Sequence, residues 1–189
     1  MLCAPADCVV ETGCRSATAA FLRLAANAHS TAEHDIFGRR VNHSLLGGGC
    51  VDGAIHRTAG PRLLALARTM GGCPTCQARI TPGFDLPARW IIHTVGPVWH
   101  GGGQGEAALL RSAYESCLAL AVEYRLRSIA FPAISTGVYG YPFAEAVEIA
   151  VRTAWGFTSD LDTIIFCCFR EQDAAIYQQL IREITDEMD

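Results

Sequence analysis

Residues 128–157 read SIAFPAISTGVYGYPFAEAVEIAVRTAWGF and carry the clearest structural pattern in the chain. The run Ser128 to Ala133 is short and apolar, which is typical of a strand buried on both faces. Pro142 to Phe157 has apolar residues at helical spacing and begins with proline, which the first turn of a helix tolerates well. Ile134 to Tyr141, with two glycines, connects the two. The segment therefore predicts a strand that passes through a tight loop into a helix, the repeating unit of an α/β fold.

The same alternation of strand and helix continues on both sides of this segment. Short apolar runs predict strands and apolar residues at helical spacing predict helices, while Gly60-Pro61 separates two short helices. The further strands are expected over Arg89 to Val95 and Thr163 to Phe169, and the further helices within Val51 to Met70, over Glu106 to Tyr124 and over Glu171 to Glu187.

The first 40 residues are less regular, with a candidate strand over Cys8 to Glu11 and a candidate helix over Ala17 to Ala26. The chain as a whole predicts a largely parallel sheet covered by helices on both faces. In such a fold a ligand lies beyond the carboxyl ends of the strands.

Composition narrows the function classes. The 189 residues are 50% hydrophobic and carry 15 basic against 19 acidic side chains, which is typical of one ordinary domain with a sizeable core. The net charge of −4 and the lack of a basic cluster make nucleic acid an unlikely partner. All 15 basic residues are arginine. Without lysine, neither a Walker phosphate loop nor Schiff-base catalysis is available.

The chain has no run of about 18 apolar residues, so we expect no membrane-spanning helix. Met1 to Glu11 lacks a basic leader and does not resemble a secretory signal. Nine cysteines, an odd number, fit reduced thiols better than a disulfide framework, and we expect a cytoplasmic protein. Cys73 and Cys76 have C-x-x-C spacing, but no second pair or matching histidines lie nearby, so neither a metal site nor a redox role is favoured there.

Two glycine loops are candidates for anion binding. Leu46 to Gly53 (LGGGCVDG) leads into a predicted helix, and so does the loop from Ile134 to Pro142. Backbone N–H groups at a helix N-terminus favour an anion, and two such loops on one rim suit a diphosphate without any lysine. The alternative is that both loops are ordinary turns that need positive φ. Neither loop matches the G-x-G-x-x-G fingerprint, so a dehydrogenase is not predicted.

Four single residues are further candidates for function, and each also has an ordinary structural interpretation. Asp52 is either the N-cap of the following helix or a base beside a phosphate. His56, four residues later, shares a helical face with Asp52 and is by default a packed or surface histidine. Asn42 is by default a turn residue. Phe169, at the end of a predicted strand, either belongs to the core or faces a bound ring.

With these motifs in view, the chain resembles the macrodomains and is most similar to the bacterial macrodomain O-acetyl-ADP-ribose deacetylases. The resemblance runs from about Asp35 to the C-terminus. It rests on SLLGGG at 44–49, VDGAIHR at 51–57, AGP at 59–61, LPA at 86–88, HTVGPVW at 93–99 and FPAISTGVYGYP at 131–142.

The resemblance implies a three-layer α/β/α fold with a mixed, largely parallel sheet, in which 35–189 form the core and 1–34 a divergent N-terminal segment. It implies a hydrolase that removes the acetyl group from O-acetyl-ADP-ribose, and ADP-ribose from acidic side chains of mono-ADP-ribosylated proteins. It implies no metal or other cofactor. The alternatives are a non-catalytic reader of ADP-ribose and, less expected, a degenerate fold that makes a protein contact.

The resemblance also assigns roles to residues. Asp52 would orient or deprotonate the attacking water, Asn42 would hydrogen-bond the distal ribose, and His56 would assist. Phe169 would stack on adenine, and Tyr139 would pack on the distal ribose. The remaining ligand-binding residues would be Gly48, Gly49, Cys50 and Val51 in the first loop and Ser135, Thr136, Gly137 and Val138 in the second.

The chain departs from the family pattern at four places. Arg39-Arg40-Val41-Asn42 stands where the family has Asn-Ala-Ala-Asn, and Asn27-Ala28-His29 stands where it has Gly-Asp-Ile. Cys50 replaces a fourth glycine of the first loop, and Cys76 stands where glycine is usual. The second departure replaces the aspartate that in the family binds the adenine amine.

Overall fold

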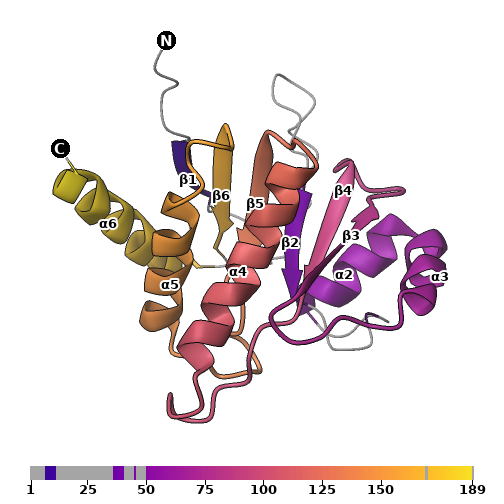
Figure 1. Ribbon diagram of the computed structural model, residues 1–189, viewed down its shortest axis with the longest axis horizontal. Coiled ribbons are helices and arrows are strands. Elements are labelled where there is room, and N and C mark those ends of the chain that lie inside the picture. Colours follow the sequence, from indigo (N-terminus) through magenta and orange to yellow (C-terminus); the bar gives the residue numbers. More distant parts are fainter. Residues whose placement is uncertain (1–6, 12–35, 41–44, 46–49, 169, 189) are drawn as a thin grey trace.

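The computed structural model describes residues 7–11, 36–40, 45, 50–168 and 170–188, and every structural statement below refers to these residues (Figure 1). The strands are β1 (Asp7–Glu11), β2 (Ile36–Arg40), β3 (Ala78–Pro82), β4 (Trp90–Thr94), β5 (Ser128–Pro132) and β6 (Thr163–Cys167), and the helices are α2 (Cys50–Ala59), α3 (Pro61–Thr69), α4 (Glu106–Glu123), α5 (Phe143–Trp155) and α6 (Glu171–Met188).

One six-stranded sheet with the order β1-β6-β5-β2-β4-β3 forms the middle of the molecule. All neighbouring strands are parallel except β3, which runs antiparallel to β4. The predicted mixed, largely parallel sheet is therefore confirmed. The candidate strand at Cys8 to Glu11 is confirmed as β1, which pairs with β6 at one edge. The candidate helix at Ala17 to Ala26 lies outside the described residues.

Two strands escaped the sequence prediction. β2 reads IFGRR and has only two apolar residues before its glycine and arginines, so no apolar run marks it. β3 reads ARITP and is an edge strand in which only Thr81 is buried. Its proline ends the strand at an edge, where a missing N–H is tolerated. Both strands pair with β4 along their whole length, and these backbone hydrogen bonds stabilise them as strands although their own sequences do not indicate a strand.

Two helical layers cover the sheet, because successive side chains along each buried strand point to opposite faces. On one face, Ile129 and Phe131 of β5 pack with α4, α5 and α6. On the other face, Ala130 between them packs with Ile55 of α2 and Leu63 of α3. Figure 1 shows α4 and α5 in front of the sheet, with α2 and α3 near its β3 edge. The three-layer α/β/α fold is thus confirmed.

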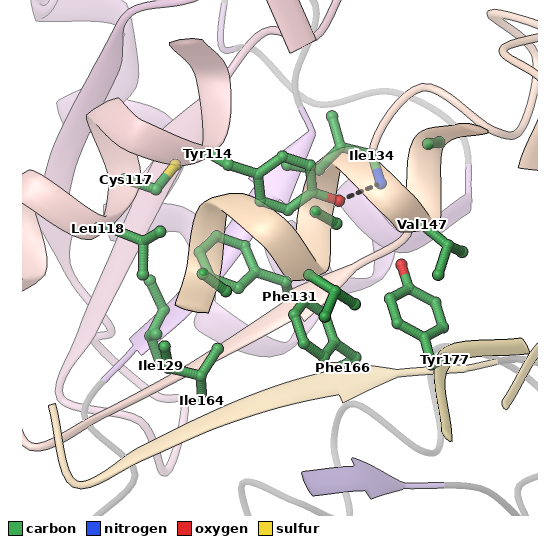
Figure 2. Close-up of a cluster of buried hydrophobic side chains, with 14 of the residues drawn as sticks. Tyr114, Cys117, Leu118, Ile129, Phe131, Ile134, Val147, Ile164, Phe166 and Tyr177 are labelled. Atoms are coloured by element: carbon green, nitrogen blue, oxygen red, sulfur yellow. Dashed lines mark hydrogen bonds between the residues drawn. The ribbon is translucent and has the colours of Figure 1, made fainter. Parts of the chain in front are cut away.

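Aromatic rings fill the larger core cluster and fasten the loop that follows β5. Phe131 packs between Tyr114 and Phe166, and Phe166 stacks on Tyr177 with ring centroids 4.8 Å apart (Figure 2). The N–H of Ile134 donates to the fully buried Tyr114 hydroxyl at 3.3 Å. Burial raises the pKa of this hydroxyl, so it stays protonated. Ile134, the second residue after β5, is therefore held by α4.

Cys73 and Cys76 are buried between α3 and β3. Cys76 N–H donates to Val95 O at 2.9 Å, and the Cys73 thiol donates to Gln77 O at 3.2 Å. Burial raises the pKa of both thiols, which makes them poor nucleophiles. A redox role for the pair therefore gains no support from its surroundings.

The backbone at Cys76 explains why glycine is usual there. Its φ is +67°, in the left-handed region that disfavours any residue with a Cβ. We predict that Cys76→Gly is more stable to unfolding than Cys76→Ala by about 0.5–1 kcal/mol, although both lose the thiol. Urea unfolding of the two variants measures the difference. A more stable alanine variant would mean that φ is not strained at this position.

No helix within the described residues is both long enough and apolar enough to cross a membrane.

Candidate functional site

The carboxyl ends of the parallel strands define one edge of the sheet, at the bottom of Figure 1. The chain leaves β2 here on its way to α2. The connection of 95–105 after β4 and the loop of 133–142 after β5 leave from the same edge. Ligands of parallel α/β sheets bind at this edge.

Asp52 lies in the first turn of α2 and is only 6% exposed. The helix already includes Cys50 and Val51, so Asp52 is not the N-cap residue and that interpretation is wrong. Its carboxylate instead lies inside the first turn, where the positive end of the helix dipole favours an anion. This leaves a buried carboxylate beside the carboxyl edge of the sheet.

His56 lies one turn after Asp52 and contacts the backbone that precedes the first glycine loop. Its Nε2 is 3.2 Å from Leu45 O, and because a carbonyl oxygen only accepts, Nε2 carries the proton. Leu45 is fully buried with φ +61° and packs in a small cluster with Val95. His56 is therefore half-buried and tied to the loop entrance, so it is not a surface histidine.

The loop after β5 is folded tightly on itself. Gly140 N–H donates to Gly137 O at 2.9 Å, and Tyr141 N–H donates to Ser135 O at 3.0 Å. Ser135 is fully buried with φ +66°. Among the described residues, the backbone N–H groups of Thr136, Gly137 and Val138 have no acceptor. Successive unpaired N–H groups in such a turn form an anion-binding concavity.

Leu45, which precedes the first glycine loop, and the loop after β5 contact consecutive residues that follow β4. Leu45 packs with Val95, and the loop after β5 lies against Gly96. A Cβ at Gly96 would collide with Ser135 Oγ and Ile134 Cγ2, so the absence of a side chain allows this approach. Trp99 N–H donates to Tyr139 O at 2.9 Å. The segment after β4 thus contacts both Leu45, just before the first predicted ligand loop, and the second predicted ligand loop.

The predicted site residues divide into three groups. Asp52 and His56 lie on one face of α2, as their spacing predicts, and the second-loop residues form one compact turn. Cys50 and Val51 begin α2, where the backbone is one that any residue adopts. The predictions for Asn42, Gly48, Gly49 and Phe169 lie outside the described residues.

Sequence reasoning missed Gly96, Trp99 and Glu106 as supports of the site. All three follow β4 closely, and the glycines at 101–103 and 105 mark an unusual connection there. These glycines indicate an unusual backbone conformation, but they do not reveal which side chain the backbone surrounds. Across the part of the chain that the structure describes, no three His, Cys, Asp or Glu side chains are grouped so as to hold a metal ion.

The sequence and the fold of this chain were both found to be similar to those of known proteins. The family model described as Macro domain matches residues 40–150. An O-acetyl-ADP-ribose deacetylase of Klebsiella pneumoniae is 55% identical over 159 residues, covering 80% of this chain and 91% of its own. An Oceanobacillus iheyensis macrodomain solved with ADP superposes with a TM-score of 0.78 at 41% identity, covering 83% of this chain and 87% of its own. A Trypanosoma brucei macrodomain in complex with ADP-ribose gives a TM-score of 0.76 at 38% identity, covering 91% and 68%.

Proposed function

The chain belongs to the macro domain family, and from this we propose that it hydrolyses ADP-ribose esters, removing the acetyl group from O-acetyl-ADP-ribose. One observation carries the proposal most directly. Within the described part of the chain, the N–H groups of Thr136, Gly137 and Val138 have no acceptor, and they lie in a loop that leaves the carboxyl edge of the sheet. The buried carboxylate of Asp52 lies in the first turn of α2, the helix that follows β2 from the same edge. A phosphate-binding loop together with a base is what hydrolysis of an ester on a phosphorylated sugar requires.

The diphosphate binds the backbone N–H groups of Ser135 to Tyr139. Backbone donors can hold this charge in a chain that has no lysine. Gly48, Gly49, Cys50 and Val51 line the other side, Tyr139 packs on the distal ribose, and Phe169 stacks on adenine. These assignments follow the motifs that the chain shares with the family.

The reaction needs one water and one base. Asn42 holds the distal ribose while Asp52 orients the water and accepts its proton. The water oxygen then bonds to the acetyl carbonyl carbon. The resulting tetrahedral species releases the ribose oxygen, which takes up a proton, and the products are acetate and ADP-ribose. General-base help of this kind is typically worth about 10²- to 10⁴-fold in rate.

A second substrate class contains the same bond. Esters between ADP-ribose and acidic side chains of proteins differ only in the acyl group. Val138 at the tip of the loop is 83% exposed, so the rim of the loop is accessible to a macromolecule. We therefore include mono-ADP-ribosylated proteins among the substrates. A reader that binds ADP-ribose without turnover is the alternative, and catalytic turnover separates the two.

We also propose a cytoplasmic location. The five cysteines that the structure describes as free, Cys73, Cys76, Cys117, Cys167 and Cys168, are all buried thiols, as suits a reducing compartment. No nucleic acid or membrane partner is part of the proposal.

A multiple-turnover assay tests the proposed function. O-acetyl-ADP-ribose is supplied in large excess over the protein, and ADP-ribose release is followed by chromatography. Many turnovers per protein molecule support the hydrolase. Binding of ADP-ribose by calorimetry without turnover would support the reader, and the absence of both would contradict the proposal as a whole.

His56 assists by holding the entrance of the first loop, and two isosteric variants test this. A glutamine amide nitrogen reaches the position of Nε2, whereas that of asparagine reaches only the position of Nδ1. We expect His56→Gln to keep kcat/KM within about threefold and His56→Asn to lose about tenfold, the value of one hydrogen bond. Equal losses in both variants would indicate instead that the imidazole itself takes part in proton transfer.

A further inference from the structure

A third glycine-rich loop, residues 100–105, is built around one buried carboxylate. Glu106, the first residue of α4, is 1% exposed. Its Oε1 accepts the N–H groups of His100 at 3.0 Å and Gly102 at 3.2 Å, and its Oε2 accepts that of Gln104 at 2.7 Å. Gly101, Gly102 and Gly105 have φ between +79° and +100°, the left-handed region, which lets the backbone curl around the carboxylate.

The charge of Glu106 is balanced by the backbone. Its own N–H lowers the pKa of its carboxyl, burial acts in the opposite direction, and the N–H groups of His100, Gln104 and Gly102 lower it further. Glu106 therefore remains a carboxylate at neutral pH. A carboxylate can accept all three N–H groups, whereas an amide would direct a donor at one of them.

This loop supports Trp99, and Trp99 supports the ligand loop. A Cβ at Gly102 would lie 2.9 Å from Cη2 of Trp99, so the backbone of the loop packs directly on the indole. The indole also packs on Tyr141, with ring centroids 4.6 Å apart. The Trp99 N–H donates to Tyr139 O, and the Tyr141 N–H donates to Ser135 O. Trp99 thus contacts the ligand loop through the backbone of Tyr139 and the ring of Tyr141, and the Tyr141 N–H connects that ring residue to Ser135 within the loop.

We propose that Glu106 is a positioning residue that sets the conformation of the 134–142 loop through Trp99, and thereby the affinity of the chain for the diphosphate of ADP-ribose. The effect on affinity rests on the proposed function, whereas the effect on loop conformation does not. Glu106 itself is assigned no contact with the ligand. Its carboxylate acts by holding the backbone on which the indole lies.

Three variants test this role. Glu106→Gln removes the charge and keeps the size. Gln104→Pro removes one donor to the carboxylate without altering Glu106, and Gln104→Ala keeps that donor as its control. Ile184→Ala is the stability control, because Ile184 is buried in α6, which packs on α5 and β1 rather than on this loop. Amide hydrogen exchange at Trp99 and Tyr141, calorimetric binding of ADP-ribose and steady-state kinetics are measured for each variant.

We expect Glu106→Gln and Gln104→Pro to speed exchange at the amides of Trp99 and Tyr141 by about tenfold or more. The Kd for ADP-ribose and the KM should rise by about tenfold, with kcat changed by less than about threefold, because Asp52 is untouched. Ile184→Ala and Gln104→Ala should leave exchange at these two amides and the Kd unchanged. A double-mutant cycle of Glu106→Gln with Trp99→Leu should be clearly non-additive in Kd, since one effect runs through the other residue.

Unchanged exchange and Kd in both Glu106→Gln and Gln104→Pro would overturn the inference, and so would an equal rise of Kd in Ile184→Ala. If Glu106→Gln does not fold, Gln104→Pro against Gln104→Ala decides. If the unaltered chain does not bind ADP-ribose, the proposed function fails, and the exchange comparison alone decides whether Glu106 positions the loop.

Discussion

Asp52→Ala is expected to slow release of ADP-ribose from O-acetyl-ADP-ribose by about 10²- to 10⁴-fold. The variant should bind ADP-ribose within about tenfold of the unaltered chain, because the diphosphate is held by the backbone of the other loop. Asp52 is buried in the first turn of α2, where its carboxylate can hold a water against the ester. Initial rates with saturating substrate, together with calorimetric binding of ADP-ribose, measure both quantities.

Two further variants make the test of Asp52 specific. Asp52→Asn keeps the size of the side chain but cannot accept a proton, so it should be nearly as slow as Asp52→Ala if Asp52 is the base. Asp162→Asn is the control. Asp162 lies just before β6, at the amino ends of the parallel strands and away from the proposed site, where it pairs with Arg127. This variant should have normal turnover. Unchanged turnover in Asp52→Ala would remove Asp52 from the mechanism, even if the chain proved to be a hydrolase.

Gly96→Ala is expected to weaken ADP-ribose binding by about 100-fold or more, because a displaced loop would lose about two hydrogen bonds to the charged diphosphate, each worth about 1.5–3 kcal/mol. The added methyl group would collide with Ser135 Oγ and Ile134 Cγ2. The N–H of Ile134 is held by Tyr114, so the loop cannot move away as a unit. The free energy of unfolding should also fall by about 1–3 kcal/mol, as is typical of overpacking.

Gly103→Ala is the matched control for Gly96→Ala. No atom lies within 4 Å of a Cβ at Gly103, and Gly103 is not among the positive-φ glycines. Its binding and stability should therefore match those of the unaltered chain. If Gly96→Ala bound ADP-ribose normally, the loop of 134–142 would not be the phosphate-binding loop, whatever the effect on stability.

Much of the architecture could be predicted because local and tertiary preferences agree. The helix pair separated by Gly60-Pro61 and the strands at 90–94, 128–132 and 163–167 all appear close to their expected bounds. In each strand the apolar run is continuous because both faces are covered by helices. β2 and β3 lacked such a run, and only their pairing with β4 reveals them.

The candidate site was only partly predictable for a related reason. Its motifs lie next to helices and strands that the periodicity of apolar residues predicts. For this reason Asp52, His56 and the loop of 134–142 could be identified as candidates from the sequence. The supports of the site are long-range contacts. Nothing in the local sequence relates Trp99 to Tyr139, or His56 to Leu45, because each pair meets only when the strand ends are brought to one edge.

Sequence periodicity and the glycine motifs thus determined the α/β class, the order of most helices and strands, the family resemblance and the residues proposed to carry the chemistry. All of these features depend on the spacing of neighbouring residues along the chain, which the sequence shows directly. The tertiary structure decided that Asp52 lies inside α2 rather than capping it, and that His56 hydrogen-bonds the backbone oxygen of Leu45. It also decided that Gly96 and Trp99 contact the 134–142 loop. Those contacts join residues that are distant in the sequence. They form only when the sheet packs against its two helical layers, because that packing brings the atoms within hydrogen-bond or van der Waals distance.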